Sequence, residues 1–280
     1  MPELPEVETV RRTLERVLKG QRIVRAEVMP DEIMMFGVEP EVIQQAIEGR
    51  KVVAVGRHGK YWWLELDEKP WLYGHLGMSG WVRELGAPTI RLREHGKKPM
   101  EDEEGRPRFL KLLLEAEDGR RVAFTDGRRL GRLWLSSDPS KDKRMEKLGP
   151  DVLDELPSEK QLKAILAKRK APIKALLLDQ KLFAGVGNWI ADEALYQARV
   201  SPKRLGNELS SAQVRALRKA LEEVVGTAVE LGADKEKFPE SWLFHVRWGG
   251  AKGHEMIEGK PIVRETVGGR TTAWVPKIQK

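Results

Sequence analysis

Apolar residues recur at helical spacing near the start of the chain and then change to short strand-like runs. Between residues 5 and 19 they fall on one face of a helix, and the pattern stops at Gly20, a residue typical of helix ends. The apolar positions of this helix are Val7, Val10, Leu14, Val17 and Leu18. Strand-like runs follow at 22–29, 51–55, 61–66, 71–75, 110–115, 121–125 and 132–135. Many short strands separated by Gly, Asp and Pro favour a β-sandwich.

The pattern changes after Gly149-Pro150, where helical spacing returns. We expect helices near 158–168, 172–180, 188–198 and 210–231. The end of the chain regains strand character, and Gly268-Gly269 between two such runs is a strong signal for a two-residue hairpin. The sequence therefore predicts an α+β protein with a β-sandwich domain, a helical domain and a terminal β-hairpin, over residues 1–150, 151–242 and 243–280.

Composition narrows the class of protein. A chain of 280 residues with 40% hydrophobic content can bury a sizeable core in one or two domains. The formal net charge of +7 suits a polyanionic partner, and residues 163–174 and 243–280 are both basic. The absence of cysteine excludes disulfides and thiolate metal sites. Without a signal peptide or an apolar run approaching ~18 residues, we expect a soluble intracellular protein.

The first seven residues read MPELPEV, which places a proline directly after the initiator methionine. Removal of Met1 would leave Pro2 with a free secondary amine beside the Glu3 carboxylate, a nucleophile next to an acid/base group. An ordinary α-amino pKa of ~8 leaves part of this amine unprotonated at neutral pH. Pro5 and the acids after it also fit an ordinary helix start, but that interpretation does not account for Pro2.

Further glycine-bearing segments combine turns with side chains that can meet a ligand. Lys60 stands in RHGKYW, a turn that leads into a strand, while residues 74–80 read GHLGMSG and residues 125–131 read TDGRRLG. Residues 172–198 predict a helix, two glycine-bearing turns and a second helix, whose first amides form a natural phosphate site. Ordinary structural interpretations exist for these segments: a solvated turn lysine, a glycine-rich turn with a core methionine, and a helical hairpin packed for stability.

Together, these motifs resemble the formamidopyrimidine-DNA glycosylase/endonuclease VIII family over nearly the whole chain. The resemblance implies a bifunctional DNA glycosylase and abasic-site lyase that excises oxidised bases and cuts the strand by β,δ-elimination. It implies Pro2 as the nucleophile, Glu3 as the acid/base group and Lys60 as a catalytic lysine that also grips a phosphate. Glu6 and Glu193 are further candidates near the site. No cofactor is implied, and the expected partner of this monomer is double-stranded DNA with oxidised bases or abasic sites.

The resemblance also implies how the protein holds DNA. Phosphate contacts are expected from His75, Lys174, Asn188 and Arg270. Met78 is expected to fill the space left by an everted nucleotide, and Arg128 to hydrogen-bond the unpaired base opposite. Leu130 stands where the family usually has an aromatic residue, which puts discrimination of the opposite base in question.

The C-terminal segment departs from most relatives, which close with a four-cysteine zinc finger. His245 and His254 are too few for a closed tetrahedral site, whereas Arg270 and its hairpin are kept. The segment is similar to the zincless finger of the plant and fungal branch, with apolar packing expected from Ile262, Val263, Trp274 and Val275. Residues 232–249 are shorter than the lesion-capping loop of bacterial relatives. This implies ring-opened purines and heavily oxidised guanines as substrates in preference to 8-oxoguanine.

Two other functions stay open. One is excision of oxidised pyrimidines, as in the endonuclease VIII branch. The other is a catalytically silent protein that binds damaged DNA through the helix–two-turns–helix motif and the finger. The presence of Pro2, Glu3 and Lys60 speaks against catalytic silence.

Overall fold

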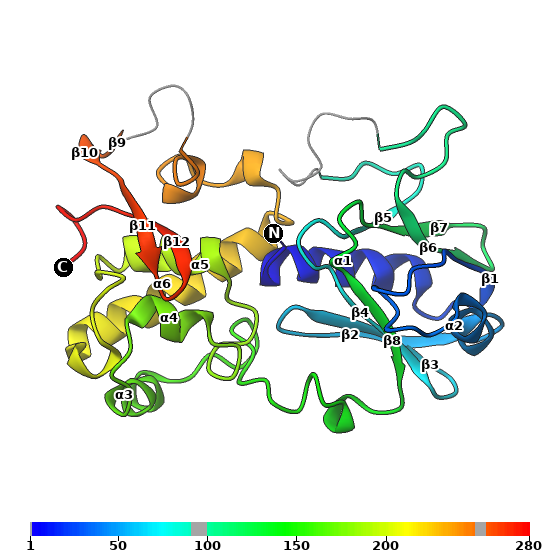
Figure 1. Ribbon diagram of the computed structural model, residues 1–280, viewed down its shortest axis with the longest axis horizontal. Coiled ribbons are helices and arrows are strands. Elements are labelled where there is room, and N and C mark those ends of the chain that lie inside the picture. Colours follow the sequence, from blue (N-terminus) through cyan, green and yellow to red (C-terminus); the bar gives the residue numbers. More distant parts are fainter. Residues whose placement is uncertain (1, 91–99, 250–255) are drawn as a thin grey trace. The chain divides into compact units, whose positions relative to one another are not determined.

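The computed structural model describes residues 2–90, 100–249 and 256–280 and divides into two compact units, Met1–Lys147 and Leu148–Lys280 (Figure 1). In its described residues, the first unit has two four-stranded antiparallel sheets and two α-helices. The second has four α-helices and two short β-hairpins. The predicted α+β class is confirmed. The division of the second unit into a helical domain and a finger stays a prediction.

Two sheets form the β-sandwich of the first unit. One has the strand order β1 (Ile23–Val28), β6 (Leu110–Ala116), β7 (Arg121–Thr125) and β5 (Trp81–Glu84). The other has the order β2 (Val52–His58), β3 (Tyr61–Leu66), β4 (Trp71–His75) and β8 (Arg132–Ser136). Strand β5 and helix α2 (Pro40–Ile47) were not anticipated, because such short elements give no clear periodic pattern.

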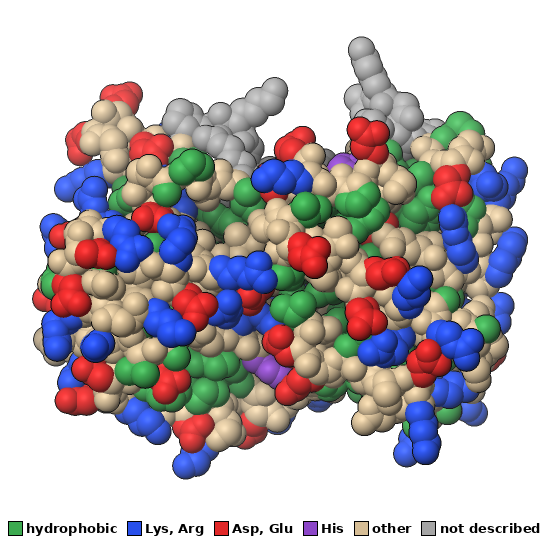
Figure 2. All heavy atoms as spheres, turned by 180° about the vertical axis from the view of Figure 1, so that it is seen from behind, with side chains coloured by type: hydrophobic (Ala, Val, Ile, Leu, Met, Phe, Trp, Pro, Cys, Tyr) green, Lys and Arg blue, Asp and Glu red, His purple; other side chains and the backbone are tan. Residues whose placement is uncertain are grey.

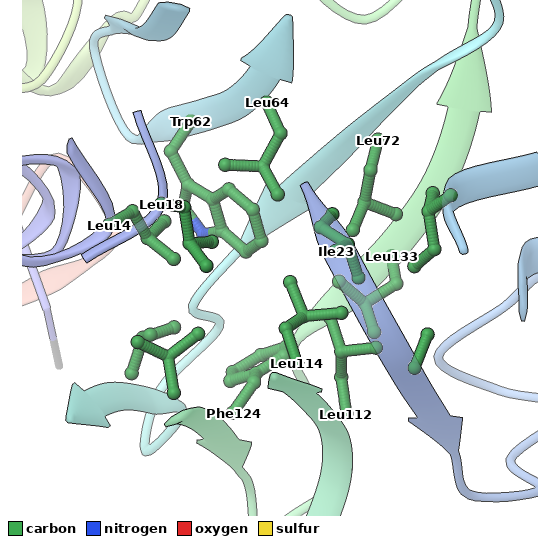
Figure 3. Packing of buried hydrophobic residues seen from close by; sticks show 14 of the residues in the cluster. Leu14, Leu18, Ile23, Trp62, Leu64, Leu72, Leu112, Leu114, Phe124 and Leu133 are labelled. Atoms are coloured by element: carbon green, nitrogen blue, oxygen red, sulfur yellow. The ribbon is translucent and has the colours of Figure 1, made fainter. Parts of the chain in front are cut away.

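The core of the first unit lies between the two sheets and helix α1 (Leu4–Leu18). Figure 3 shows Leu14 and Leu18 of this helix beside the Trp62 indole, with Leu114 and Phe124 contributed by the other sheet. Trp62 is 1% exposed, and its partner across β3 and β4 is Gly74. A Cβ atom at Gly74 would lie 2.1 Å from the Trp62 ring, so this glycine is explained by packing.

Helices lie in the second unit where the periodicity predicts them. They are α3 (Glu159–Ala167), α4 (Ile173–Leu178), α5 (Asn188–Gln197) and α6 (Ser211–Glu230). The two turns between α4 and α5 are organised by the Gln180 amide, which donates to the carbonyls of Leu178 and Val186 and accepts from the Gly185 N–H. One side chain thereby satisfies three backbone groups that the turns leave without helical partners.

A small β-hairpin ends the second unit. Strands β11 (Val263–Val267) and β12 (Arg270–Trp274) are joined by Gly268-Gly269, both with left-handed φ values, 61° and 74°. A shorter hairpin of β9 (Met256–Ile257) and β10 (Lys260–Pro261) precedes it. In Figure 1 the larger hairpin lies beside α5, and the two elements are in contact.

Apolar packing joins the terminal hairpin to helix α5, as predicted in outline. The buried cluster contains Tyr196, Leu243, Ile262, Ala273 and Val275. Trp274 is also buried, and its indole N–H donates to Glu265 at 2.7 Å. The expectation was wrong for Val263, which is 36% exposed at the start of β11.

Gly74→Ala should lower the free energy of unfolding by about 1–3 kcal/mol, because the added methyl group overpacks the core against Trp62. Denaturant unfolding measures the change. The matched control is Gly226→Ala within α6, where a Cβ meets nothing within 4 Å; it should raise stability by about 0.5–1 kcal/mol. Equal shifts of the same sign would show that Gly74 is not required by packing.

Candidate active site and nucleic-acid contacts

Pro2 and Glu3 lie directly before helix α1, and both are buried. A capping box joins Glu3 to Glu6, in which the Glu6 carboxylate accepts a hydrogen bond from the Glu3 N–H at 2.9 Å. Burial and the nearby charge of Glu3 raise the pKa of Glu6 to about 7. Glu6 therefore holds the backbone of Glu3, directly after Pro2, and titrates near neutral pH.

A buried arginine connects helix α1 to the hairpin that carries Lys60. The Arg57 side chain is 2% exposed and donates from Nε to Glu8 at 3.0 Å and from a terminal nitrogen to the Gly59 carbonyl at 3.3 Å. Burial by itself raises the pKa of Glu8, but its hydrogen bonds and ion pairs with arginines lower it overall. Glu8 is therefore a carboxylate that anchors both the helix and the turn at Gly59-Lys60.

His75 is a neutral hydrogen-bond donor close to Lys60. It ends β4 opposite Tyr61 of β3, and the two rings are 5.0 Å apart. Burial, then the charges of Lys60 and Arg132, lower the pKa of His75 to about 4. Its Nδ1 accepts a hydrogen bond from the Gly77 N–H at 3.0 Å, so the proton of the neutral ring sits on Nε2. This nitrogen can donate to an anion that the neighbouring cations attract.

Met78, Arg128 and Leu130 lie on two loops that pack against each other. A Cβ atom at Gly77 would lie 2.3 Å from the Leu130 backbone, which shows how closely the loops approach. Met78 is half-buried, Leu130 is 39% exposed and Arg128 is exposed. The structure thus brings the three predicted DNA-facing side chains of this unit onto adjoining loops.

One buried carboxylate that the sequence analysis missed organises these loops. Asp126 is 1% exposed and accepts hydrogen bonds from the Ser79 hydroxyl at 2.7 Å and from the N–H groups of Arg128, Leu130 and Gly131 at 3.1, 2.9 and 2.7 Å. Aspartate followed by glycine is the local signal for a side chain that caps its own turn. The bond to Ser79 depends on tertiary contact, and no sequence signal reveals it.

In the second unit, Asn188 begins helix α5 and donates from its side-chain amide to the Thr271 carbonyl at 2.9 Å. Lys174 does not lie where a direct phosphate contact requires it. Its side chain is fully buried, forms an ion pair with Asp192, and donates to the Asn188 carbonyl at 3.0 Å. Lys174 therefore positions the start of α5 from within, and the interpretation as a phosphate contact is corrected to this role.

Arg270 lies next to Asn188 through the hairpin backbone. It is exposed and directly follows Gly268-Gly269, and its neighbour Thr271 accepts the Asn188 hydrogen bond. A Cβ atom at Gly268 would lie 2.8 Å from the Ala175 side chain, so the tip packs closely on α4. Asn188 and Arg270 therefore form one potential phosphate site in this unit.

Glu193 is fully buried, which gives it a structural role. Its carboxylate accepts from the Gln197 amide at 2.9 Å and from the Phe244 N–H at 2.8 Å. Burial raises its pKa to about 7. The bond to Phe244 ties α5 to the short helical turn Leu243–His245. Glu193 therefore holds a loop, and its burial gives it no direct access to a ligand.

Surface charge, possible metal ligands and helix hydropathy bear on the sequence-based expectations. The face in Figure 2 carries basic side chains interspersed with acidic ones, so the net positive charge is not gathered into one patch there. Among the described residues, no group of three or more His, Asp and Glu side chains could hold a metal ion, and His254 lies outside those residues. Within the same part of the chain, no helix is long and apolar enough to cross a membrane.

Both units match known protein families. Residues 1–133 match the formamidopyrimidine-DNA glycosylase N-terminal domain, and residues 148–240 match the formamidopyrimidine-DNA glycosylase H2TH domain. A formamidopyrimidine-DNA glycosylase of Arabidopsis thaliana is 40% identical over 280 residues, which is 100% of this chain and 71% of that protein. One from Pelotomaculum thermopropionicum is 34% identical over 299 residues, covering 100% and 99%. The crystal structure of the Lactococcus lactis enzyme, non-covalently bound to DNA with an abasic site, has a TM-score of 0.79 and 28% identity and covers 99% of each chain.

His75 should remain neutral far below the ordinary histidine pKa of 6.5 and titrate at about 4. NMR titration of its ring measures this, and Lys60→Met should raise the value because one of the opposing charges is removed. Since the folded pKa is depressed, the stability contributed by this shift is present above pH 6.5 and is lost as the pH falls through about 4. A His75 titration near 6.5 in the wild type would show that the ring is not buried beside these cations.

Proposed function

The chain belongs to the formamidopyrimidine-DNA glycosylase family, and we propose from this that it removes oxidised bases from DNA and then cuts the strand at the abasic site. The observation that carries the mechanism is the N-terminus itself. Pro2 and Glu3 are buried side by side before α1, and the Glu6 carboxylate accepts a hydrogen bond from the N–H of the peptide that joins them. After removal of Met1, this arrangement presents a secondary amine whose position is set by a rigid helix.

The Pro2 amine attacks the anomeric carbon of the damaged nucleotide, and the C–N bond to the base breaks as the base leaves. The nitrogen loses its one proton as the bond to carbon forms, and its lone pair then expels the ring oxygen to give an iminium ion. Because the amine is secondary, this iminium ion has no N–H proton and keeps its positive charge. Glu3 protonates the sugar ring oxygen as the ring opens, and the strand is then cut by elimination on both sides of the sugar. Burial and the charge of Glu3 raise the pKa of Glu6 to about 7, so Glu6 is a neighbouring carboxyl group that can hold a proton at neutral pH.

Lys60 and His75 bind the phosphate beside the damaged nucleotide. The His75 ring is buried, and the charges of Lys60 and Arg132 act on it, a setting that lowers its pKa and favours an anion nearby. The neutral ring donates from Nε2, while Lys60 supplies the charge. Lys60 also transfers protons during elimination. Arg57 supports this role, because it bonds both to Glu8 of α1 and to the carbonyl of Gly59, the residue before Lys60.

The two adjoining loops of the first unit support nucleotide eversion. Taking a nucleotide out of the stack costs a few kcal/mol, part of which is recovered when an apolar side chain fills the gap. Met78 and Leu130 are the apolar side chains available on these loops, and Arg128 offers several donors to the base left unpaired. In the second unit, Asn188 and Arg270 hold phosphates.

The substrates we propose are ring-opened purines and heavily oxidised guanines, with oxidised pyrimidines as the second class to test. The short segment 232–249 supports the first choice. DNA as the substrate places the protein in the nucleoid-containing cytoplasm of a bacterium or in the nucleus of a eukaryote.

Borohydride should trap the enzyme covalently on DNA containing an oxidised base, because it reduces the iminium ion on Pro2. Peptide mapping should place the adduct on residue 2. A matched protein with an N-terminal extension, in which the Pro2 nitrogen is an amide, should trap nothing. An adduct on Lys60 would overturn the assignment of the nucleophile, and no adduct in the processed wild type would overturn lyase chemistry altogether.

Arg270→Ala should weaken binding to damaged and undamaged duplex alike and reduce the slope of log affinity against log salt by about one unit, as expected for the loss of one phosphate contact. Fluorescence titration at several salt concentrations measures both quantities. Arg215→Ala is the control, because Arg215 is an exposed arginine of the same unit that pairs with Glu159. Wild-type affinity and slope in Arg270→Ala would show that the hairpin does not touch DNA.

A further inference from the structure

Phe109 is an exposed aromatic side chain with an unusual backbone. It directly precedes β6, is 57% exposed, and has a φ of 58°. A bulky residue adopts this left-handed conformation only when surrounding bonds hold it there. If the position served only the turn, glycine would fit it without strain. The turn alone therefore does not explain a phenylalanine at this position, and the exposed ring contributes little to the core.

Hydrogen bonds fix Phe109 against the loop that carries Arg128. The Phe109 carbonyl accepts from the Asp126 N–H at 3.0 Å, next to the β-pairing of Leu110 with Thr125. On the other side, the Arg108 N–H donates to the Met100 carbonyl at 2.9 Å. The ring thus stands on two anchored backbone segments.

The Phe109 ring lies over Gly127, one residue before Arg128. A Cβ atom at Gly127 would meet three ring atoms of Phe109 at 3.1–3.3 Å. Because glycine has no side chain, the ring can pack directly on the loop at this position. The Arg108 guanidinium lies 5.6 Å from the ring centroid. A flat apolar surface and two arginines are therefore presented together, a combination that binds nucleobases in single-stranded nucleic acids.

We infer that Phe109 forms a stacking site for the unpaired nucleobase opposite the lesion, whose edge Arg128 contacts. Leu130 on the same loop is apolar but has no ring, so it cannot provide the face-to-face contact that a base requires. Phe109 would provide that contact from its position directly before β6. The inference rests on the proposed function, because a base becomes unpaired only when the nucleotide across from it is everted or absent.

A duplex with a tetrahydrofuran abasic analogue opposite 2-aminopurine tests this site. Binding of the wild type should quench the 2-aminopurine fluorescence, because the base stacks on the ring. Phe109→Leu should lose the quenching and bind roughly 5- to 150-fold more weakly, the range that base–aromatic stacking supports. Phe109→Tyr keeps the ring and should retain both properties. Wild-type quenching by Phe109→Leu, or loss of quenching in both variants, would overturn the inference.

Phe36→Leu is the matched control. Phe36 is 49% exposed with a φ of 56°, but the guanidinium groups of Arg144 and Arg132 lie 4.4 and 5.6 Å from its ring centroid. The Phe36→Leu variant should quench 2-aminopurine fluorescence and bind the duplex like the wild type. Losses of quenching and affinity equal to those of Phe109→Leu would show that the effect at Phe109 is not specific.

Borohydride trapping on a single-stranded abasic oligonucleotide separates this inference from the proposed function. Phe109→Leu should trap there as well as the wild type, since no opposite base exists, and a lower yield than the wild type would overturn the stacking role. Failure to trap the wild type on the same abasic oligonucleotide in a duplex would reject the proposed function.

Discussion

The buried ion pair between Arg57 and Glu8 joins the helix that follows the proposed nucleophile to the hairpin that carries Lys60. Glu8 belongs to helix α1 and Arg57 to the end of β2, and the same guanidinium also holds the turn that carries Lys60. Breaking a buried pair of this kind costs about 3–5 kcal/mol, whereas an exposed pair contributes at most about 1 kcal/mol. A nucleophile on a flexible terminus would need to be ordered at each turnover. Here the helix and the hairpin share one anchor, so Pro2, Glu3 and Lys60 belong to one rigid frame.

The same physical pattern recurs in both units: buried carboxylates hold the backbone of segments whose exposed side chains we propose to contact DNA. Asp126 accepts three backbone N–H groups in the loop of Arg128 and Leu130. Asp192 pairs with Lys174 and with Arg247 at 2.5 Å, and it accepts from the Ala273 N–H at 3.3 Å. Each aspartate gives rigidity to contacts that would otherwise lose binding free energy to loop ordering.

In the second unit, a network of charged groups and apolar packing hold the terminal hairpin in place, as a bound metal does in zinc-finger proteins. Helix α5 and strand β12 are joined through Asp192, through the Asn188–Thr271 hydrogen bond, and through the apolar cluster around Tyr196. The hairpin can therefore keep its geometry without cysteine ligands. Lys174 belongs to this network and does not face a phosphate, because its ammonium group is the buried partner of Asp192.

The sequence by itself determined the elements with long periodic patterns and the motifs confined to neighbouring residues. Helix α1, the strands of the sandwich, the helices of the second unit and the Gly268-Gly269 hairpin all follow from local spacing, and the MPELPEV string carried the family resemblance. Only the tertiary structure decided which charges are buried and which side chains share a surface. Lys174 and Arg270 look alike as residues in a basic segment, yet one is fully buried and the other is exposed. Asp126 with Ser79, Arg57 with Glu8 and Phe109 with Gly127 are partners across different strands and loops, and such pairings depend on how the sheets fold together, which local spacing does not encode.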